Sequence, residues 1–139
     1  MMRVGLLLIG CVGCTSPYQS AVTDVPPRKW YTTAEIRLEN GDSTTLRDAD
    51  LFLRCDDRFA EDTLTVRIAT LSPDSLRFEE PFLLAISRTG GPAALMREFL
   101  VPYRRRICLG RTGEYRIQIT PTRPVRGIEA VGIRLSKSN

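Results

Sequence analysis

Gly113-Glu114-Tyr115-Arg116-Ile117-Gln118-Ile119-Thr120 is the stretch in which polar and apolar residues alternate most regularly along this chain. Successive side chains of a β-strand point to opposite faces, so Tyr115, Ile117 and Ile119 share one face and polar residues share the other. Glycine-rich sequence precedes the stretch and proline-rich sequence follows it, as is typical of turns. The pattern predicts a strand that covers an apolar core with one face and contacts water with the other.

Similar alternating segments recur along most of the chain, separated by turn-forming Gly, Pro, Asn, Asp and Ser. They cover approximately residues 30–39, 49–55, 63–68, 76–86, 99–109, 113–120 and 130–136. No segment has a convincing helical period, although residues 93–99 are compatible with either one helical turn or an extended edge. Pro81 cannot donate to a ladder, so its strand is expected at a sheet edge or a bulge. The chain is therefore predicted to be all-β, a single β-sandwich of about seven or eight mostly antiparallel strands.

The first fourteen residues have the pattern of an export signal that ends in a lipid-attachment site. Arg3 precedes an apolar run over residues 4–9, which is far shorter than the ~20 residues that a membrane-spanning helix needs. Leu8-Ile9-Gly10-Cys11 fits the bacterial lipoprotein box, and Cys14 is the alternative attachment site because it also follows a glycine and leaves a longer apolar segment. A buried N-terminal strand is the structural alternative. We expect a lipoprotein anchored to a membrane of the cell envelope, in the outer membrane facing the periplasm, because no acidic run follows either cysteine.

The chain of 139 residues has room for one core and not for two. Residues 1–14 are assigned to the signal and anchor, 15–28 to a flexible tether, and 29–139 to the sandwich domain. The tether assignment rests on three prolines, small polar residues and the lack of an apolar period. An extended proline-rich chain rises about 3.1 Å per residue, so this tether would hold the domain on the order of 40 Å from the lipid.

The composition excludes several classes of function. The formal net charge is +4 and charged residues make up 26% of the chain, which indicates a solvated surface and no nucleic-acid footprint. The chain has no histidine, which removes the usual general base, the Ser-His and Cys-His nucleophile pairs and every zinc site that needs His. Adjacent carboxylates at Asp56-Asp57 and Glu79-Glu80 point to opposite faces of a strand, so neither pair forms an acid–base site by itself. We therefore expect no enzyme, no catalytic residue, no metal site and no cofactor.

Cysteine and arginine residues provide the remaining candidate sites. Cys55 and Cys108 are a candidate disulfide pair if their strands are neighbours in an oxidising compartment, or else two thiols buried separately. Arg104, Arg105 and Arg106 form a candidate partner surface for anionic groups, although alternation splits them across faces and a solvated strand edge is the alternative.

Three aromatic residues also stand out in the alternating pattern. Tyr31 and Phe52 fall on nominally polar faces and are candidates for a partner surface. Trp30 lies on the apolar side of its segment, and we expect it to fill the core.

Two segments near the C-terminus resemble the two closing strands of the gliding motility lipoprotein family GldH. They are Gly113–Ile119 and, after a spacer, Gly127-Ile128-Glu129-Ala130-Val131-Gly132-Ile133-Arg134-Leu135. That family carries a G-x-Y strand and then a G-I-x-x-V-G-[LI]-R-[IL] strand. Asp50-Leu51-Phe52-Leu53-Arg54 also resembles its strand ending in L-R, and Trp30 resembles its early tryptophan. This chain departs from the family after L-R, where Cys55-Asp56-Asp57-Arg58-Phe59 replaces an asparagine and a Tyr-Pro-Tyr stretch.

The resemblance implies a small lipid-anchored β protein of the Bacteroidota cell envelope, needed for motility in gliding members. Two functional hypotheses follow. The first is a non-enzymatic envelope lipoprotein that binds membrane through its lipid and other envelope proteins through its domain, in gliding-motility or secretion-associated machinery. The alternative is a carbohydrate-binding β-sandwich lipoprotein.

Overall fold

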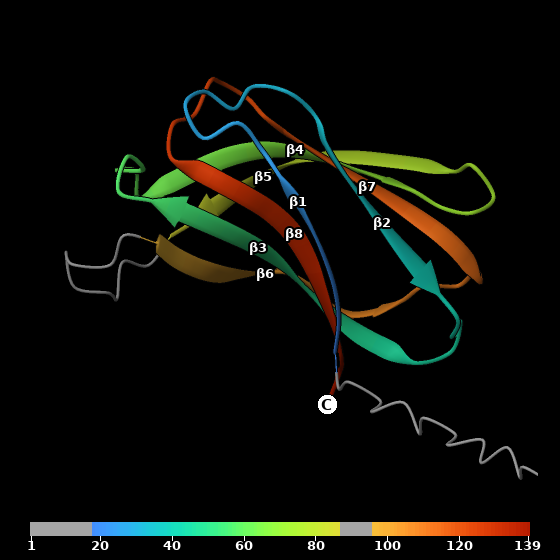
Figure 1. The fold of residues 1–139 in the computed structure, drawn as a ribbon. Helices are drawn as coiled ribbons and strands as arrows, with labels where there is room; N and C mark the ends of the chain where they lie inside the picture. The colour runs from blue at the N-terminus through green and yellow to red at the C-terminus, as the bar shows by residue number, and fades with distance from the viewer. Residues whose placement is uncertain (1–17, 87–95) are drawn as a thin grey trace, which may run out of the picture.

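The computed structural model describes residues 18–86 and 96–139, which form eight strands in two four-stranded sheets (Figure 1). The strands are β1 (Tyr18–Asp24), β2 (Ala34–Asn40), β3 (Leu46–Asp56), β4 (Thr63–Leu71), β5 (Arg77–Ala85), β6 (Met96–Cys108), β7 (Gly113–Pro121) and β8 (Ile128–Lys137). Sheet 1 has the order β1-β8-β3-β6 and sheet 2 the order β2-β7-β4-β5. Every pairing within them is antiparallel.

The strand order identifies the kind of sandwich. Strands of the two sheets alternate along the chain except for consecutive β4 and β5, which pair in sheet 2. The last two strands, β7 and β8, occupy interior positions in sheet 2 and sheet 1. This interleaving of eight antiparallel strands is the jelly roll. The predicted all-β sandwich is confirmed.

The core lies between the sheets and is built from the alternation seen in the sequence. Tyr115, Ile117 and Ile119 of β7 are buried, and they pair in register with Leu38, Ile36 and Ala34 of β2. Trp30 is fully buried, as predicted, and its backbone forms an isolated bridge with Val125. Its indole Nε1 donates to the carbonyl of Thr32 at 2.8 Å, which satisfies the buried polar group.

The prediction of a flexible tether over residues 15–28 is partly wrong. Residues 18–24 form β1, an edge strand that pairs with β8 over seven residues, from Tyr18 opposite Ser136 to Asp24 opposite Ala130. An edge strand needs few apolar residues of its own, because its backbone hydrogen bonds come from the neighbouring strand and one of its faces stays exposed. The composition of residues 18–24 is therefore typical of a linker, although their pairing with β8 makes them a strand.

Pro81 lies in β5, the edge strand of sheet 2, so the predicted edge position is confirmed. At this position the missing N–H costs no ladder bond. Of the undecided segment 93–99, residues 96–99 belong to β6 and the rest lies outside the described residues.

Two glycines permit close backbone approaches. Gly127, where the chain crosses from β7 to β8, has φ +86°, and a Cβ there would lie 2.2 Å from the Phe59 nitrogen. Gly132 lies in the middle of sheet 1, where a Cβ would lie 2.5 Å from the Ala21 carbonyl oxygen on β1. Gly132 thus allows β1 to lie against β8 in the same sheet, whereas Gly127 allows the chain to change sheets.

No helix within residues 18–86 and 96–139 is long and apolar enough to span a membrane.

We predict that Gly127→Ala lowers the free energy of unfolding by at least about 2 kcal/mol, because it adds both left-handed strain and a clash with backbone. Chemical denaturation measures the change. Gly110→Ala is the matched control, since nothing lies within 4 Å of its added Cβ, and it should change stability by less than about 0.5 kcal/mol. Equal stability of the two variants would contradict the role of Gly127.

Candidate functional site

An apolar row crosses the outer face of sheet 1. Gly132 of β8 lies in register between Val22 of β1 and Phe52 of β3, and Phe52 lies opposite Leu100 of β6. Val22 is 45% exposed and Leu100 44%, so both present apolar surface to solvent. Because each residue comes from a different strand, only the paired sheet brings the row together.

Aromatic and charged groups flank this row. The Arg134 guanidinium carbon lies 4.9 Å from the centroid of the Tyr18 ring, and that of Arg54 lies 5.7 Å from the Phe52 ring. Arg54 Nε also donates to Glu98 Oε1 at 3.3 Å. Together these side chains line a shallow hollow of about 470 Å³. We call the hollow and the apolar row the sheet 1 face.

Arg134 has unused hydrogen-bonding capacity on this face. Its Nε is buried and has no partner among the described residues. The neighbouring carboxylate of Asp50 instead accepts from Arg105 Nη2 at 2.9 Å. A buried donor without an acceptor is uncommon in folded proteins, and it indicates a position where a further acceptor would be stabilising.

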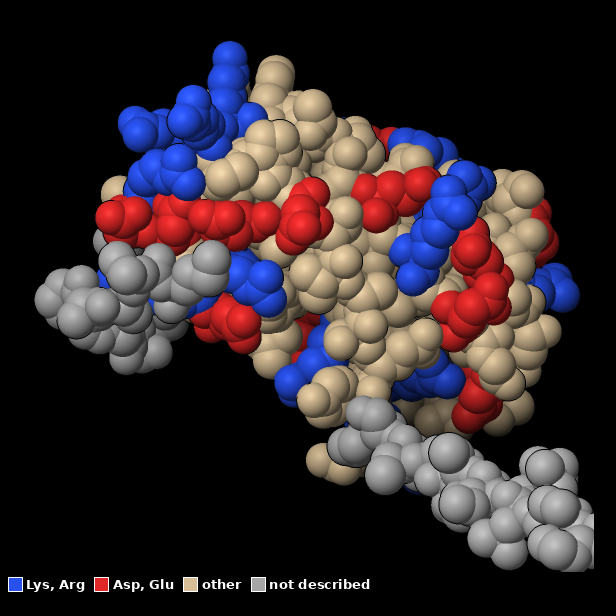
Figure 2. Space-filling view, in the orientation of Figure 1, with Lys and Arg blue, Asp and Glu red and all other residues tan. Residues whose placement is uncertain are grey.

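The outer face of sheet 2 is of a different kind. Glu35 pairs with Arg37 and Arg116, and Glu79 pairs with Arg67 and Arg77, each pair being at least partly exposed. These contacts make an ion-paired, hydrated surface. In Figure 2, on the side where β1, β8 and β3 are seen in Figure 1, uncharged surface instead lies between flanking acidic and basic groups. The two faces of the sandwich are therefore chemically distinct.

The three consecutive arginines that the sequence singles out lie at the far end of β6, and each contacts acceptors of this same chain. Arg104 pairs with Glu80 of β5, and Arg105 pairs with Asp50 of β3. The Arg106 backbone N–H donates to Asp48 Oδ1 at 2.9 Å, at a place where the β3–β6 register shifts. All three side chains remain exposed, so their role as a partner surface stays a prediction, although much of their charge is already compensated.

The two cysteines are free and are not brought together, which corrects the candidate disulfide. Their strands are neighbours, but Cys108 lies opposite Leu46 whereas Cys55 lies nine residues (55 − 46) further along β3. At about 3.3 Å per residue the separation is roughly 30 Å, and a disulfide needs Cα atoms within about 7 Å. Cys55 is buried, and burial raises the pKa of its thiol to about 12. Cys108 is exposed.

The adjacent carboxylates diverge as the alternation predicts. Glu79 faces outward to Arg67 and Arg77, whereas Glu80 faces β6 and accepts from the Tyr103 hydroxyl at 2.5 Å. Asp56 contacts Arg58, whose hydrogen bond lowers the pKa of Asp56 to about 2. Among the residues that the structure describes, no three His, Cys, Asp or Glu side chains converge as metal ligands.

Sequence reasoning found one part of the sheet 1 face and missed another. Phe52 and Tyr31 stand out as aromatic residues on polar faces; Phe52 lies in the row, whereas Tyr31 is 54% exposed and precedes β2. Tyr18 and Val22 were hidden in the segment assigned to the tether. The alternation of Tyr18, Ser20 and Val22 is the signal that could have revealed them.

The anchor candidates Cys11 and Cys14 lie outside the described residues.

No protein-family model matches the chain, and no curated protein matches it either. Among solved structures, a chain from the structure of infectious bursal disease virus Gt strain is similar at 10% sequence identity with a TM-score of 0.38. The similarity covers 88% of this chain and 36% of the viral chain, so this chain spans about a third of that protein's length. The assignment of the jelly roll rests on the strand order alone.

We predict that Glu80→Gln destabilises the protein by about 1–2 kcal/mol at pH 7, because it removes a charged acceptor shared by Tyr103 and Arg104. Burial raises the pKa of Glu80, but those two hydrogen bonds outweigh it and leave the pKa below its ordinary value of 4.5. The contribution of the Glu80 carboxylate to stability is therefore full above pH 4.5 and is lost as pH falls through the lowered pKa of Glu80. Denaturation of both proteins between pH 7 and 3 should show the difference shrinking in the acid range.

Glu114→Gln is the control, since Glu114 is exposed and has no ion pair among the described residues. If the difference in unfolding free energy between wild type and Glu80→Gln stayed constant from pH 7 to pH 3, the stabilising role of the ionised Glu80 carboxylate would be contradicted.

Proposed function

We propose that this chain is a non-enzymatic, lipid-anchored protein of the cell envelope that binds a protein partner through the sheet 1 face. The observation that carries the proposal is the apolar row of exposed Val22, half-buried Phe52 and exposed Leu100, beside Arg134, whose Nε has no acceptor among the described residues. The GldH-like closing strands support a place in gliding-motility or secretion-associated machinery.

The chemistry of the face suggests what its partner presents. Aromatic and arginine side chains dominate the energetics of protein interfaces when a partner excludes water from them. Tyr18 and Phe52 each hold an arginine over the ring, so both guanidinium groups are already ordered before binding. We infer a partner surface that is apolar at its centre and places a carboxylate or a backbone carbonyl against Arg134.

The anchor would hold the domain close to the membrane. Because β1 begins at Tyr18, it lies only four positions after Cys14 and seven after Cys11. Fully extended, these segments span about 14 and 25 Å. The expected location of the protein remains a membrane of the cell envelope, the outer membrane facing the periplasm. Its partner would bind the domain within this short distance of the membrane.

A carbohydrate-binding lipoprotein is the competing proposal for the same face. Tyr18 and Phe52 are the rings on which a sugar would stack, but each of them is occupied by an arginine of this chain. Saturable binding of a polysaccharide to wild type, lost in Phe52→Ala, would support this alternative over a protein partner.

We predict that the mature protein carries a lipid on one cysteine near its N-terminus. Intact mass and membrane fractionation of wild type, Cys11→Ala and Cys14→Ala would identify which cysteine. Loss of the lipid mass and of membrane retention in one variant assigns the anchor to that residue. Retention of lipid in both variants would contradict the proposed anchor at these positions.

We predict that a photocrosslinking residue placed at Leu100 captures a discrete partner protein in the native envelope. Leu83 is the matched control, because it is an exposed leucine, 62% accessible, on the outer side of sheet 2. Capture from Leu100 should require the native face, and Phe52→Ala should weaken it at least about tenfold.

Identical capture from Leu83 and Leu100 would contradict a specific sheet 1 face. So would capture from Leu100 that Phe52→Ala and Arg134→Met both leave unchanged.

A further inference from the structure

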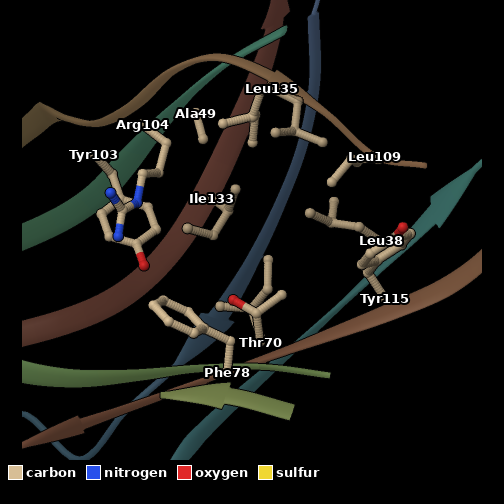
Figure 3. A pocket seen from close by; sticks show the side chains of 12 residues that line it. Leu38, Ala49, Thr70, Phe78, Tyr103, Arg104, Leu109, Tyr115, Ile133 and Leu135 are labelled. Carbon is tan, nitrogen blue, oxygen red and sulfur yellow. The ribbon is translucent and has the colours of Figure 1, made fainter. Parts of the chain in front are cut away.

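A cavity of about 520 Å³ that is open to solvent lies between the two sheets at one end of the sandwich. This end carries the β2–β3, β4–β5 and β6–β7 turns, opposite the end that Trp30 fills. Figure 3 shows side chains of both sheets converging on the space, with Ile133 and Leu135 on one side and Leu38 and Phe78 on the other. The cavity is separate from the sheet 1 face, which lies on the outer side of sheet 1.

The cavity opens between the edge strands β5 and β6. Phe78, Glu80, Phe82 and Leu84 alternate along the same side of β5, which pairs with β4 without a register shift. Leu84 is 1% exposed, whereas Phe78 is 59% exposed although it occupies the same inner row. Sheet 1 therefore covers β5 at one end and leaves it uncovered at the other, where Phe78 forms part of the mouth.

Polar contacts span the mouth on both sides of Phe78. Tyr103 and Arg104 of β6 both donate to Glu80 Oε1 of β5. On the other side, Arg111 Nε lies 3.4 Å from Asp74 Oδ2 in the β4–β5 turn. Burial and the bond to Glu80 raise the pKa of Tyr103 to about 12, so its hydroxyl remains a donor at neutral pH. The mouth is thus held in place by groups of both sheets.

The lining is suited to an alkyl chain. Most of the side chains that surround the cavity are aliphatic or aromatic, and the hydroxyl of Tyr115 already accepts the Arg111 backbone N–H. Too few polar groups remain to satisfy a sugar or a peptide backbone, which would leave buried polar atoms without partners. Stacked sheets lie about 10 Å apart, and at this end the short side chains of Ala49 and Thr70 leave part of that space open to an alkyl chain.

Arg104 is a cation at the mouth that suits an anionic head group. Arg104 donates from Nη2 to Glu80, and its guanidinium also hydrogen-bonds the side chain of Tyr103. A guanidinium carries five N–H donors and binds carboxylates through two of them at once. Its carbon lies 5.3 Å from the centroid of the Tyr103 ring, which orders the group at the entrance.

We propose that this cavity binds a long-chain fatty acid, with the alkyl chain between the sheets and the carboxylate on Arg104 at the mouth. Burial of each methylene contributes about 0.8 kcal/mol, so the chain supplies most of the affinity and the carboxylate sets the orientation. The position of the cavity fits such a ligand. Tyr18 pairs with Ser136, next to the cavity residue Leu135, so the chain enters the domain at this end. If the lipid anchor proposed above is present, this end faces the membrane.

Titration of the purified full chain with cis-parinaric acid, a fluorescent fatty acid, tests the proposal. We expect saturable binding that dodecanoic acid displaces and that its methyl ester displaces about tenfold less well, since the ester has no charge for Arg104. Arg104→Met should weaken dodecanoate binding about tenfold and leave binding of the ester unchanged. Arg116→Met, on the outer side of sheet 2, is the matched control and should bind like wild type.

Two substitutions fill the cavity independently. Ala49→Leu from sheet 1 and Thr70→Leu from sheet 2 each add volume to the lining and should weaken binding at least about tenfold. A diazirine-bearing fatty acid on the wild-type chain provides a test that needs no variant. It should label residues 103–109 and 133–135.

Absence of saturable binding, equal displacement by acid and ester, or labelling confined to residues 18–22 and 52–54 would overturn the proposal. The labelling outcome would place the fatty acid on the sheet 1 face, whereas the other two outcomes leave the partner proposed for that face untouched; crosslinking in the envelope tests that partner separately.

Discussion

The crossing of the chain at Gly127 is the constraint on which the rest of the structure depends. Here the backbone leaves β7, in the interior of sheet 2, and enters β8, in the interior of sheet 1. The Gly127 N–H donates to the Pro27 carbonyl, and its own carbonyl accepts from the Asp56 N–H, both at 2.8 Å. The Phe59 backbone occupies the place of a side chain. The Gly127 backbone is therefore fixed between Pro27 and Asp56, just before β8, the strand that pairs with both β1 and β3.

The two ends of the sandwich differ because of side-chain size. At the end near the Gly127 crossing, the space between the sheets is filled by Trp30, Val125 and Ile128, each at most 2% exposed. At the other end the facing positions include Ala49 and Thr70, and a cavity remains between the same two sheets. This space opens to solvent beside Phe78, which is 59% exposed, so the short side chains at this end leave room that the chain does not fill itself. This difference underlies the proposed fatty-acid site.

The two outer faces differ in a similar way. The face of sheet 2 satisfies its charges among its own strands, and exposed pairs of this kind contribute little to stability. The face of sheet 1 exposes apolar and aromatic groups and leaves Arg134 Nε without an acceptor. A water-facing sheet surface gains nothing from such an arrangement, whereas a surface that becomes buried against a partner does.

The sequence by itself determined the all-β class, the strands from Ala34 onward, the burial of Trp30 and the edge position of Pro81. Each of these features follows from the alternation of side chains or from the missing N–H of proline. Both are properties of a single segment of sequence. Only the tertiary structure decided that residues 18–24 form a strand, that Cys55 and Cys108 lie far apart, and that Arg104 meets Glu80 across the sheets. These features depend on register and on which strands become neighbours, and hydrogen bonds between distant segments set both. The sheet 1 face and the cavity belong to the second group, because their residues come from strands that meet only in the folded sandwich.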